Sequence, residues 1–248
     1  MKIHIENKLY TCGDIHGDPV ELTFKIALKD LKDCTIICLG DVGIFRYRDY
    51  KHYKYLNSVC AERNITVYAL RGNHDNPGFF NDLSNPIIKR FWEKFTNFKP
   101  LRDFDIIDYE GYHILTLPGA TSRDRCTRKS WHSTKINVYD YYRGGDWWAK
   151  EVIPPIPDTL PEFDVILSHN GPIPCRGIIT IPDSFKAQDG AIESDIAEEQ
   201  KYLHSIHSKY KPKAWWFGHY HHTYEYELDN TQCRILAISE LLEFKLDE

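Results

Sequence analysis

The feature that most restricts how this chain can fold is a series of short apolar, β-prone runs that each end at a small polar motif. Five such motifs follow one another along the sequence: Asp14-Ile15-His16, Gly40-Asp41, Gly72-Asn73-His74-Asp75, Ser168-His169 and Gly218-His219-Tyr220-His221. A short apolar run of this kind predicts a buried strand. Ligand sites in open α/β sheets form at the carboxyl ends of the strands, so we expect the five motifs to converge.

In the first half of the chain, predicted strands alternate with predicted helices. Strands are expected over residues 9–12, 35–39 and 65–70, and helices over residues 18–31 and 49–63. Asp18 and Pro19 suit the N-cap and first turn of the first helix. We expect Leu22, Ile26 and Leu28 on its buried face. The alternation predicts right-handed crossovers and a mainly parallel sheet.

The pattern changes after Pro100, where two hairpins are expected. Glu110-Gly111 and Asp229-Asn230 are their turns, and the flanking strands cover residues 104–108, 113–117, 224–228 and 233–238. Two further strands are expected over residues 163–167 and 214–217, and a helix over residues 191–208. These elements predict a second, more antiparallel sheet. An α/β fold of two packed mixed β-sheets flanked by helices fits one domain over residues 1–248 better than two domains.

One long segment, residues 119–161, has no clear periodicity. It is rich in basic residues and tryptophan: Arg123, Arg125, Arg128, Lys129, Lys135, Arg143, Trp131, Trp147 and Trp148. Connections of this length are commonly functional. We interpret the segment as an insertion that shapes a substrate site.

Composition excludes some classes of protein. The net charge of −5 argues against a nucleic-acid partner. No apolar run is long enough to span a membrane, and the first residues lack the apolar core of a signal peptide. The seven cysteines are scattered without a CxxC pair, which favours free thiols in a reducing compartment. We therefore expect a cytoplasmic protein without a membrane partner.

The five motifs consist of residues that bind divalent metals through carboxylate, imidazole or amide oxygen atoms. Taken singly, each motif is also typical of an ordinary strand end or an Asx turn. Their shared position and order favour one metal site. Two adjacent divalent ions can generate a nucleophile from water and hold a phosphoryl group. Mn²⁺ is the preferred ion, and Fe and Zn²⁺ are the alternatives that this ligand set allows.

These motifs resemble those of the calcineurin-like metallophosphoesterase superfamily, whose D-x-H, G-D, G-N-H-D, S-H and G-H-x-H blocks occur here in family order between Asp14 and His221. The resemblance implies a two-sheet core flanked by helices and two metal ions at the strand ends. One metal is expected to bind Asp14, His16 and His221, and the other Asn73, His169 and His219. Asp41 is expected to bridge the two metals. His74 is expected to act on the leaving oxygen or the phosphoryl group, and Asp75 to orient the His74 ring.

The resemblance also implies a reaction, in which a hydroxide that bridges the two metals attacks the phosphorus of a phosphorylated substrate. A short match at Leu70-Arg71 favours phosphomonoesters, phosphoprotein among them. Phosphodiesters or nucleotides are the alternative, and a non-catalytic scaffold is a third possibility that intact ligand positions disfavour.

One departure from the family concerns the second motif. Ser/Thr protein phosphatases continue it as G-D-x-x-D-R-G, but this chain reads Gly40-Asp41-Val42-Gly43-Ile44-Phe45-Arg46. The usual aspartate and arginine are therefore missing. The segment from Gly119 to Arg125, together with the later Trp147, Trp148 and Glu151, is instead similar to compact bacterial and phage-type members. Arg123 and Arg125 are hypothesised to bind the substrate phosphate, Arg125 being the preferred candidate.

Overall fold

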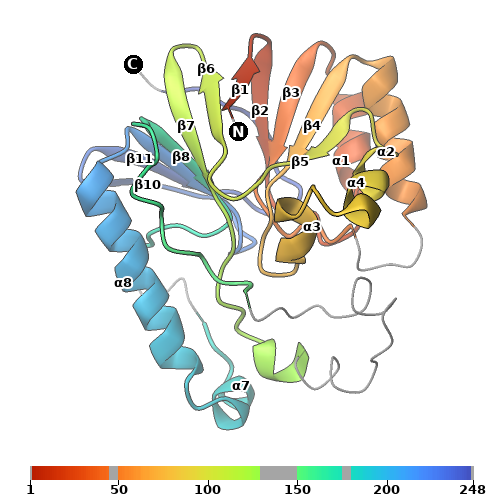
Figure 1. Cartoon of the computed structure of the whole chain (residues 1–248). Helices are drawn as coiled ribbons and strands as arrows, with labels where there is room; N and C mark the ends of the chain where they lie inside the picture. Colours follow the sequence, from red (N-terminus) through yellow and green to blue (C-terminus); the bar gives the residue numbers. More distant parts are fainter. Residues whose placement is uncertain (1, 45–49, 129–149, 175–179, 247–248) are drawn as a thin grey trace.

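The computed structural model describes residues 2–44, 50–128, 150–174 and 180–246, and two β-sheets form its centre (Figure 1). The first sheet has five strands, in spatial order β12 (Leu241–Glu243), β2 (Lys8–Cys12), β3 (Cys34–Cys38), β4 (Ile65–Ala69) and β5 (Phe98–Pro100). Only β12 runs antiparallel to its neighbour, so the first sheet is mainly parallel, as the alternation of strands and helices predicted.

The second sheet has seven strands. Their spatial order is β1 (Lys2–Ile5), β6 (Ile106–Tyr109), β7 (Tyr112–Leu117), β8 (Val165–Ser168), β9 (Ala214–Phe217), β11 (Thr231–Ile235) and β10 (Tyr224–Leu228). The two predicted hairpins, β6–β7 and β10–β11, are confirmed as antiparallel pairs. The remaining pairs are parallel, so this sheet is mixed, with more antiparallel pairing than the first.

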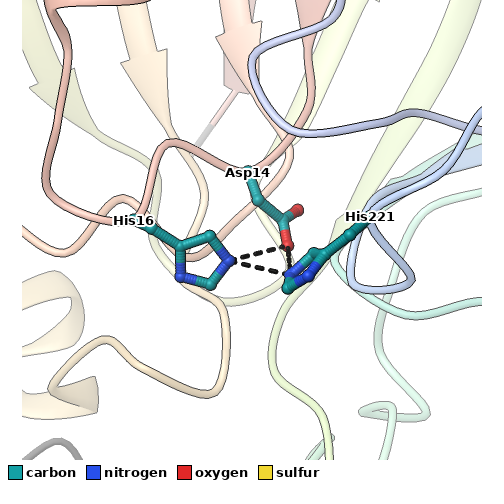
Figure 2. A group of neighbouring side chains, drawn as sticks. All are labelled: Asp14, His16 and His221. Atoms are coloured by element: carbon teal, nitrogen blue, oxygen red, sulfur yellow. Dashed lines mark hydrogen bonds and ion pairs between the residues drawn. The ribbon is translucent and has the colours of Figure 1, made fainter.

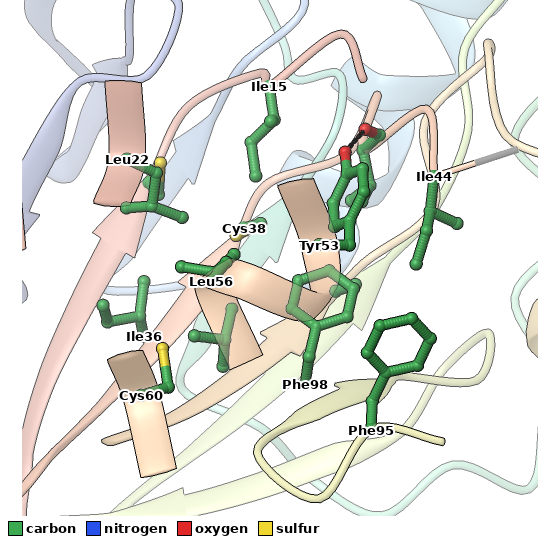
Figure 3. Close-up of a cluster of buried hydrophobic side chains, with 14 of the residues drawn as sticks. Ile15, Leu22, Ile36, Cys38, Ile44, Tyr53, Leu56, Cys60, Phe95 and Phe98 are labelled. Carbon is green, nitrogen blue, oxygen red and sulfur yellow. Dashed lines mark hydrogen bonds between the residues drawn. The ribbon is translucent and has the colours of Figure 1, made fainter. Parts of the chain in front are cut away.

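Helices cover the outer faces of both sheets (Figure 1). The first sheet packs against α1 (Val20–Leu28), α2 (Lys51–Glu62), α3 (Pro77–Asn81) and α4 (Pro86–Trp92). Figure 3 shows part of this buried cluster, which includes Leu22 from α1, Leu56 from α2 and Ile36 of β3. Beyond α7 (Asp183–Gln188), α8 (Ile192–Tyr210) lies along the second sheet and contributes Leu203 and Ile206. The predicted α/β fold of two mixed sheets flanked by helices is confirmed.

The inner faces of the two sheets form a separate apolar layer. Strand residues alternate between faces, so Ile37 of β3 faces the second sheet while Ile36 faces the helices. On β9, Trp216 belongs to the inner layer and Trp215 to the layer against α8. Each buried large aliphatic side chain stabilises the fold by about 1.5–3 kcal/mol relative to its exposed state. This packing holds the carboxyl ends of both sets of strands at fixed positions.

At each end of the described chain, the terminal strand belongs to a different sheet from the strand next to it in sequence. Strand β1 pairs with β6 in the second sheet, whereas β2 immediately after it belongs to the first sheet. Near the other end, β10 and β11 belong to the second sheet, whereas β12, which follows them, pairs with β2 in the first sheet. The sheets are therefore tied together at both ends of the chain.

The structure corrects some details of the sequence predictions. Leu28 is 73% exposed, because only Leu22, Thr23 and Ile26 face the sheet; a residue six positions after Leu22 points to another side of the helix. The first helix also ends earlier than expected, since Asp30 takes a left-handed backbone conformation. Strands β1, β5 and β12 and helices α3, α4 and α7 were not predicted. Among the described helices, none combines the length and apolar character needed to cross a bilayer.

Candidate metal centre

All seven residues predicted as metal ligands lie close together where the two sheets present their strand ends. Asp14 follows β2, Asp41 follows β3 and Asn73 follows β4, while His169 and His219 follow β8 and β9. His16 and His221 extend the loops after Asp14 and His219. The predicted placement of the motifs at strand ends is confirmed. Two groups can be distinguished around Asp41.

We call the first the open group; it consists of Asp14, His16 and His221 (Figure 2). The Nε2 atoms of His16 and His221 are 2.8 Å apart. The Oδ2 atom of Asp14 lies 3.1 Å from the Nε2 atom of His221 and 3.6 Å from that of His16. Asp14 is fully buried, but the side chains of His16 and His221 are 19% and 36% exposed. This group is therefore accessible from solvent.

We call the second the closed group; it consists of Asn73, His169 and His219, all of which are buried. The Nε2 atom of His169 lies 2.7 Å from Oδ1 of Asn73, and the His169 and His219 ring centroids are 4.9 Å apart. The Nδ1 atom of His169 is 2.8 Å from the carbonyl oxygen of Leu39, to which it donates. That bond leaves Nε2 as the nitrogen available to a metal.

Asp41 lies between the two groups. Its Oδ1 atom is 3.4 Å from Nε2 of His169 in the closed group. Its Oδ2 atom is 4.0 Å from Nε2 of His16 in the open group. The side chain is only 2% exposed, and Oδ1 also accepts a hydrogen bond from the backbone N–H of His74. Asp41 is thus placed to contact ions held by either group.

Backbone strain accompanies this arrangement. His16, Asp41, His219 and His221 all have positive φ angles, of 51°, 46°, 68° and 62°. Left-handed conformations cost a residue other than glycine about 1–2 kcal/mol each, and strain of this kind clusters at functional sites. Asp and His are among the residues that tolerate it best.

Steric constraints explain why two of the motifs contain glycine. A Cβ atom at Gly72 would lie 2.2 Å from Oδ1 of Asp41, and one at Gly218 would lie 2.1 Å from Oδ1 of Asp14. Both distances are far below a permitted contact. Glycine at these positions therefore lets the loop backbone approach the carboxylates directly. The serine of the fourth motif has another role, since Ser168 Oγ accepts a hydrogen bond from the buried indole of Trp215.

The charges in the centre balance one another in the metal-free protein. Burial would raise the pKa of both Asp14 and Asp41, but the His169 charge and close contacts with neighbouring histidines lower it below the usual range. Burial opposes protonation of His169, yet Asp41 and Asp14 raise its pKa to about 10. His16 also has a raised pKa, because its carboxylate neighbours outweigh its burial. Protons on imidazoles thus neutralise two buried carboxylates.

A divalent ion fits this environment. Among the residues that the structure describes, three sets of ligand atoms lie within 4.8 Å of one another: Asp14, His16 and His221; His16, Asp41 and His74; and Asp14, Asp41 and His169. The buried Oδ2 atom of Asp14 accepts no well-aligned hydrogen bond among the described residues. Buried carboxylates are normally paired or coordinated. The donor set of carboxylate, imidazole and amide oxygen suits Mn²⁺, Fe or Zn²⁺.

His74 lies beside this centre, with Nε2 at 3.8 Å from Oδ2 of Asp41. Distance alone does not separate it from the ligands, so its role outside the ligand set stays a prediction. Burial, and then the nearby Arg128 charge, lower the pKa of His74 although Asp41 opposes them.

The expected contact between Asp75 and the His74 ring is absent from the described residues. The Asp75 carboxylate instead accepts hydrogen bonds from the backbone N–H groups of Val42, Gly43 and Gly72. Nδ1 of His74 has no hydrogen-bond partner within the part of the chain that the structure describes. Burial and the Asp41 charge raise the pKa of Asp75 to about 6 despite these bonds. Asp75 therefore joins the loops after β3 and β4, and does not orient His74.

A cavity of about 440 Å³ opens beside the centre. It is lined by five residues of the motifs, Asp41, Asn73, His74, His219 and His221, and by Arg123, Asp124, Thr180, Pro182 and Phe185. This volume lies in the range of small-molecule sites. The cavity thus provides space for a substrate next to the ligand residues.

The two arginines predicted to bind phosphate differ in position. Arg123 lines the cavity, with one guanidinium nitrogen 3.1 Å from the carbonyl oxygen of Thr180. Arg125 does not line it; its guanidinium instead pairs with Asp189 at 2.6 Å and with Asp195. These pairs raise the pKa of Arg125 above its ordinary value. The structure therefore reverses our preference and makes Arg123 the better candidate.

Four polar residues around the centre received no role from the sequence: the buried Ser122, Arg128 and Glu151, and the partly buried Glu199. Glu151 accepts hydrogen bonds from the N–H and hydroxyl of Ser122. Burial raises the pKa of Glu151 to about 7, although Arg128 and Ser122 oppose this. Ser122 and Glu151 belong to the looser second resemblance, which was the only signal for them. Residues 129–149 of the basic segment, with Trp131, Trp147, Trp148 and Arg143, lie outside the described residues.

Comparison with known proteins gives one family match. The model of the calcineurin-like phosphoesterase family matches residues 8–223 of the chain. No curated protein matches the chain in sequence.

Among solved structures, the phosphopantetheinyl hydrolase of Mycobacterium tuberculosis is 11% identical, with a TM-score of 0.46 over 94% of this chain and 91% of that one. A protein from Thermus thermophilus is also 11% identical, with a TM-score of 0.48 over 96% and 94%. At this similarity neither structure informs the activity of the chain.

Proposed function

Since the chain belongs to the calcineurin-like phosphoesterase family, we propose that it is a dinuclear metal-dependent phosphoesterase that hydrolyses phosphomonoesters. The observation that supports this most is the convergence of the six other predicted ligand residues around Asp41, beside a cavity lined by Arg123. A phosphoryl group bound there would contact metal ions held by the motif residues and the guanidinium of Arg123. Phosphoprotein is included among the proposed substrates.

Each group of ligands has a separate task in this proposal. Asp14, His16 and His221 would hold one ion, Asn73, His169 and His219 would hold the other, and Asp41 would contribute to both. Two such ions would lower the pKa of bound water and neutralise phosphoryl oxygens. We propose Mn²⁺ as the native ion.

Arg123 binds the phosphoryl oxygens in this proposal. Its planar fork can donate two parallel hydrogen bonds to a phosphate. The family's usual second-motif arginine is missing, and Arg123 approaches from the loop after β7 instead. We retain the interpretation of residues 119–161 as a substrate-shaping insertion within one domain. The exchange of β1 and β12 between sheets supports the single domain.

The test is a comparison of monoester and diester hydrolysis with p-nitrophenyl phosphate and bis(p-nitrophenyl) phosphate as substrates. The protein is stripped with a chelator and then supplied with Mn²⁺, Zn²⁺ or Fe²⁺. We expect hydrolysis that depends on added metal and favours the monoester. A preference for the diester would transfer the assignment to phosphodiesters or nucleotides, and a protein that binds no metal would refute the proposal.

His74 is proposed to donate a proton or a hydrogen bond to the leaving oxygen. His74→Asn should lower kcat by about 10²–10⁴-fold, the usual contribution of a general acid, with a smaller change in KM. Metal content, measured by elemental analysis, should stay at the wild-type level. Parallel loss of metal and activity would show that His74 is a ligand instead.

A further inference from the structure

We propose that Ser122 and Glu151 are positioning residues that fix the orientation of the Asn73 carboxamide, so that its oxygen faces the metal and its nitrogen faces away. This inference rests on the proposed function, because it assigns the oxygen of Asn73 to metal binding. It adds two residues to the site that neither the motifs nor the cavity include.

An asparagine ligand has an orientation problem that aspartate does not have. Its oxygen can bind a cation, but its NH₂ group, a half-turn of the side chain away, repels one. In the structure, Oδ1 of Asn73 lies 2.7 Å from Nε2 of His169, within the closed group. The Nδ2 atom donates a hydrogen bond of 2.7 Å to Oγ of Ser122. The contact with Ser122 therefore selects one of the two orientations.

Ser122 can accept this bond because its own proton is engaged elsewhere. Its hydroxyl donates to Oε2 of Glu151 at 2.8 Å, and its backbone N–H donates to Oε1 at 3.0 Å. Arg128 also donates to Oε2 of Glu151, at 3.3 Å. All three contacts to Glu151 are made by donors, which is the pattern of a carboxylate. The direction of each bond then follows in turn from Glu151 to Ser122 to Asn73.

The Asn73, Ser122 and Glu151 side chains are buried. Reversing the direction of one of their hydrogen bonds would therefore strongly destabilise the folded protein. Ser122 is fully buried, and Glu151 and Asn73 are each 2% exposed. Turning the amide over would place an N–H group against the Nε2 atom of His169 and an oxygen against the lone pairs of Ser122. Buried polar groups left without partners are costly, so the observed orientation is the stable one before any metal binds. Arg128 adds a bond to the backbone carbonyl oxygen of Asn73 at 3.4 Å.

The preceding residue provides a matched control. Thr121 binds Glu199 in the same way as Ser122 binds Glu151: its N–H donates to Oε1 at 3.0 Å and its hydroxyl to Oε2 at 2.7 Å. Glu151 is buried and Glu199 is partly buried. Both pairs therefore anchor one loop, but only the Ser122 hydroxyl continues to a ligand residue. A role in loop anchoring alone predicts equal effects of removing either hydroxyl.

The experiment measures Mn²⁺ binding by calorimetry at pH 8, where Glu151 is mostly ionised. Ser122→Ala and Glu151→Gln should weaken binding of one ion by about 10–100-fold, as for other residues that orient metal ligands. Ser122→Thr should restore near wild-type binding, and Thr121→Val should leave it within about twofold. Equal losses in Ser122→Ala and Thr121→Val would overturn the proposal in favour of loop anchoring.

A double-mutant cycle tests orientation itself. Asn73→Asp supplies two equivalent oxygens, so the side chain no longer needs orienting. Ser122→Ala should then have little effect on Mn²⁺ affinity in the Asn73→Asp background. A loss as large as in the wild-type background would refute the role in orientation.

A spectroscopic measurement on the metal-free wild-type protein does not depend on whether the variants fold well. The Asn73 side-chain NH₂ signals, assigned by their absence in Asn73→Asp, should exchange slowly with water, and rapid exchange would contradict the bond to Ser122. If the wild-type protein binds no Mn²⁺, the proposed function fails. If it binds Mn²⁺ and Ser122→Ala binds equally well, only this inference fails.

Discussion

The open and closed groups contain the same number of ligand residues but hold them in different ways. In the open group, His16 and His221 are partly exposed, and their Nε2 atoms contact each other and Asp14. In the closed group, His169 is fully buried, and a backbone carbonyl oxygen fixes its ring. The closed group thus has its orientation set by the fold, whereas the open group adjusts among its own members.

This difference predicts which of the two proposed ions would exchange more readily. Solvent reaches the open group directly, so an ion there can be gained or lost without movement of the core. The closed group is buried at the strand ends of both sheets, and an ion entering it would have to displace the proton on His169. Asp41 lies between the two groups. A change at Asp41 should therefore affect metal binding by both groups alike.

The largest effect is expected for Asp41→Asn, which changes the residue shared by both groups. Loss of the charge should weaken binding of both ions and lower hydrolysis by about 10³-fold or more, because each ion contributes several kcal/mol of charge stabilisation. Elemental analysis and phosphate-ester kinetics measure this. Asp105→Asn, a buried aspartate outside the centre, is the control. Retention of one full ion would mean that Asp41 belongs to a single group.

A second comparison concerns the stability of the metal-free protein. His169→Asn leaves Asp14 and Asp41 buried without their main cation and should lower the free energy of unfolding by about 3 kcal/mol. His16→Asn should lower it by about 1 kcal/mol or less, because His16 is partly exposed. Urea unfolding in the presence of a chelator measures both. His207→Asn controls for loss of a buried, hydrogen-bonded imidazole; equal losses in all three variants would contradict the comparison.

The pH dependence follows from the raised pKa of His169, which Asp41 and Asp14 hold at about 10 against the effect of burial. The folded-state pKa exceeds the unfolded value of about 6.5. The metal-free protein should therefore keep this contribution below about pH 6.5 and lose it as the pH rises toward 10.

Metal binding must displace the same proton. The affinity for Mn²⁺ should therefore increase by up to about tenfold per pH unit between about pH 6.5 and 9. Calorimetry in buffers of different ionisation enthalpy measures the released proton. If the His169→Asn variant still releases this proton when it binds Mn²⁺, the proton comes from the open group.

The smallest effect is expected on the cavity wall. Arg123→Ala should lower kcat/KM by about tenfold or more, as for a lost charged hydrogen bond. Arg125→Ala should change kcat/KM little and instead lower the melting temperature, since Arg125 is paired with Asp189 and Asp195. The reverse result would restore our original preference for Arg125.

Local patterns in the sequence predicted much of this fold. The strands after which Asp14, Asp41 and Asn73 occur were expected within one or two residues of their observed ends, because buried parallel strands give continuous apolar runs. Both hairpins were predicted from their turn residues. Pairing between distant segments was not: nothing local assigns β1 to the second sheet or β12 to the first.

The candidate centre, like the fold, was predicted only in part. Motif residues were identified because metal-binding chemistry needs particular side chains. The residues that orient them were missed, since Ser122 and Glu151 are common residue types and lie far from Asn73 in sequence. The choice between Arg123 and Arg125 could not be made from sequence either, because it depends on the position of Asp189 at the C-terminal end of α7.

The exchange of terminal strands between the sheets has a consequence for the order in which the molecule is completed during synthesis. The backbone carbonyl oxygen of Asp14 accepts the N–H of Ser239, and its Oδ1 atom accepts the N–H of His219. Strand β2, which leads to Asp14, gains its β12 neighbour only when residues 241–243 have emerged. Contacts between such distant segments form late in folding. A nascent chain would thus carry the first ligand residues long before it had a finished centre in which to trap an ion.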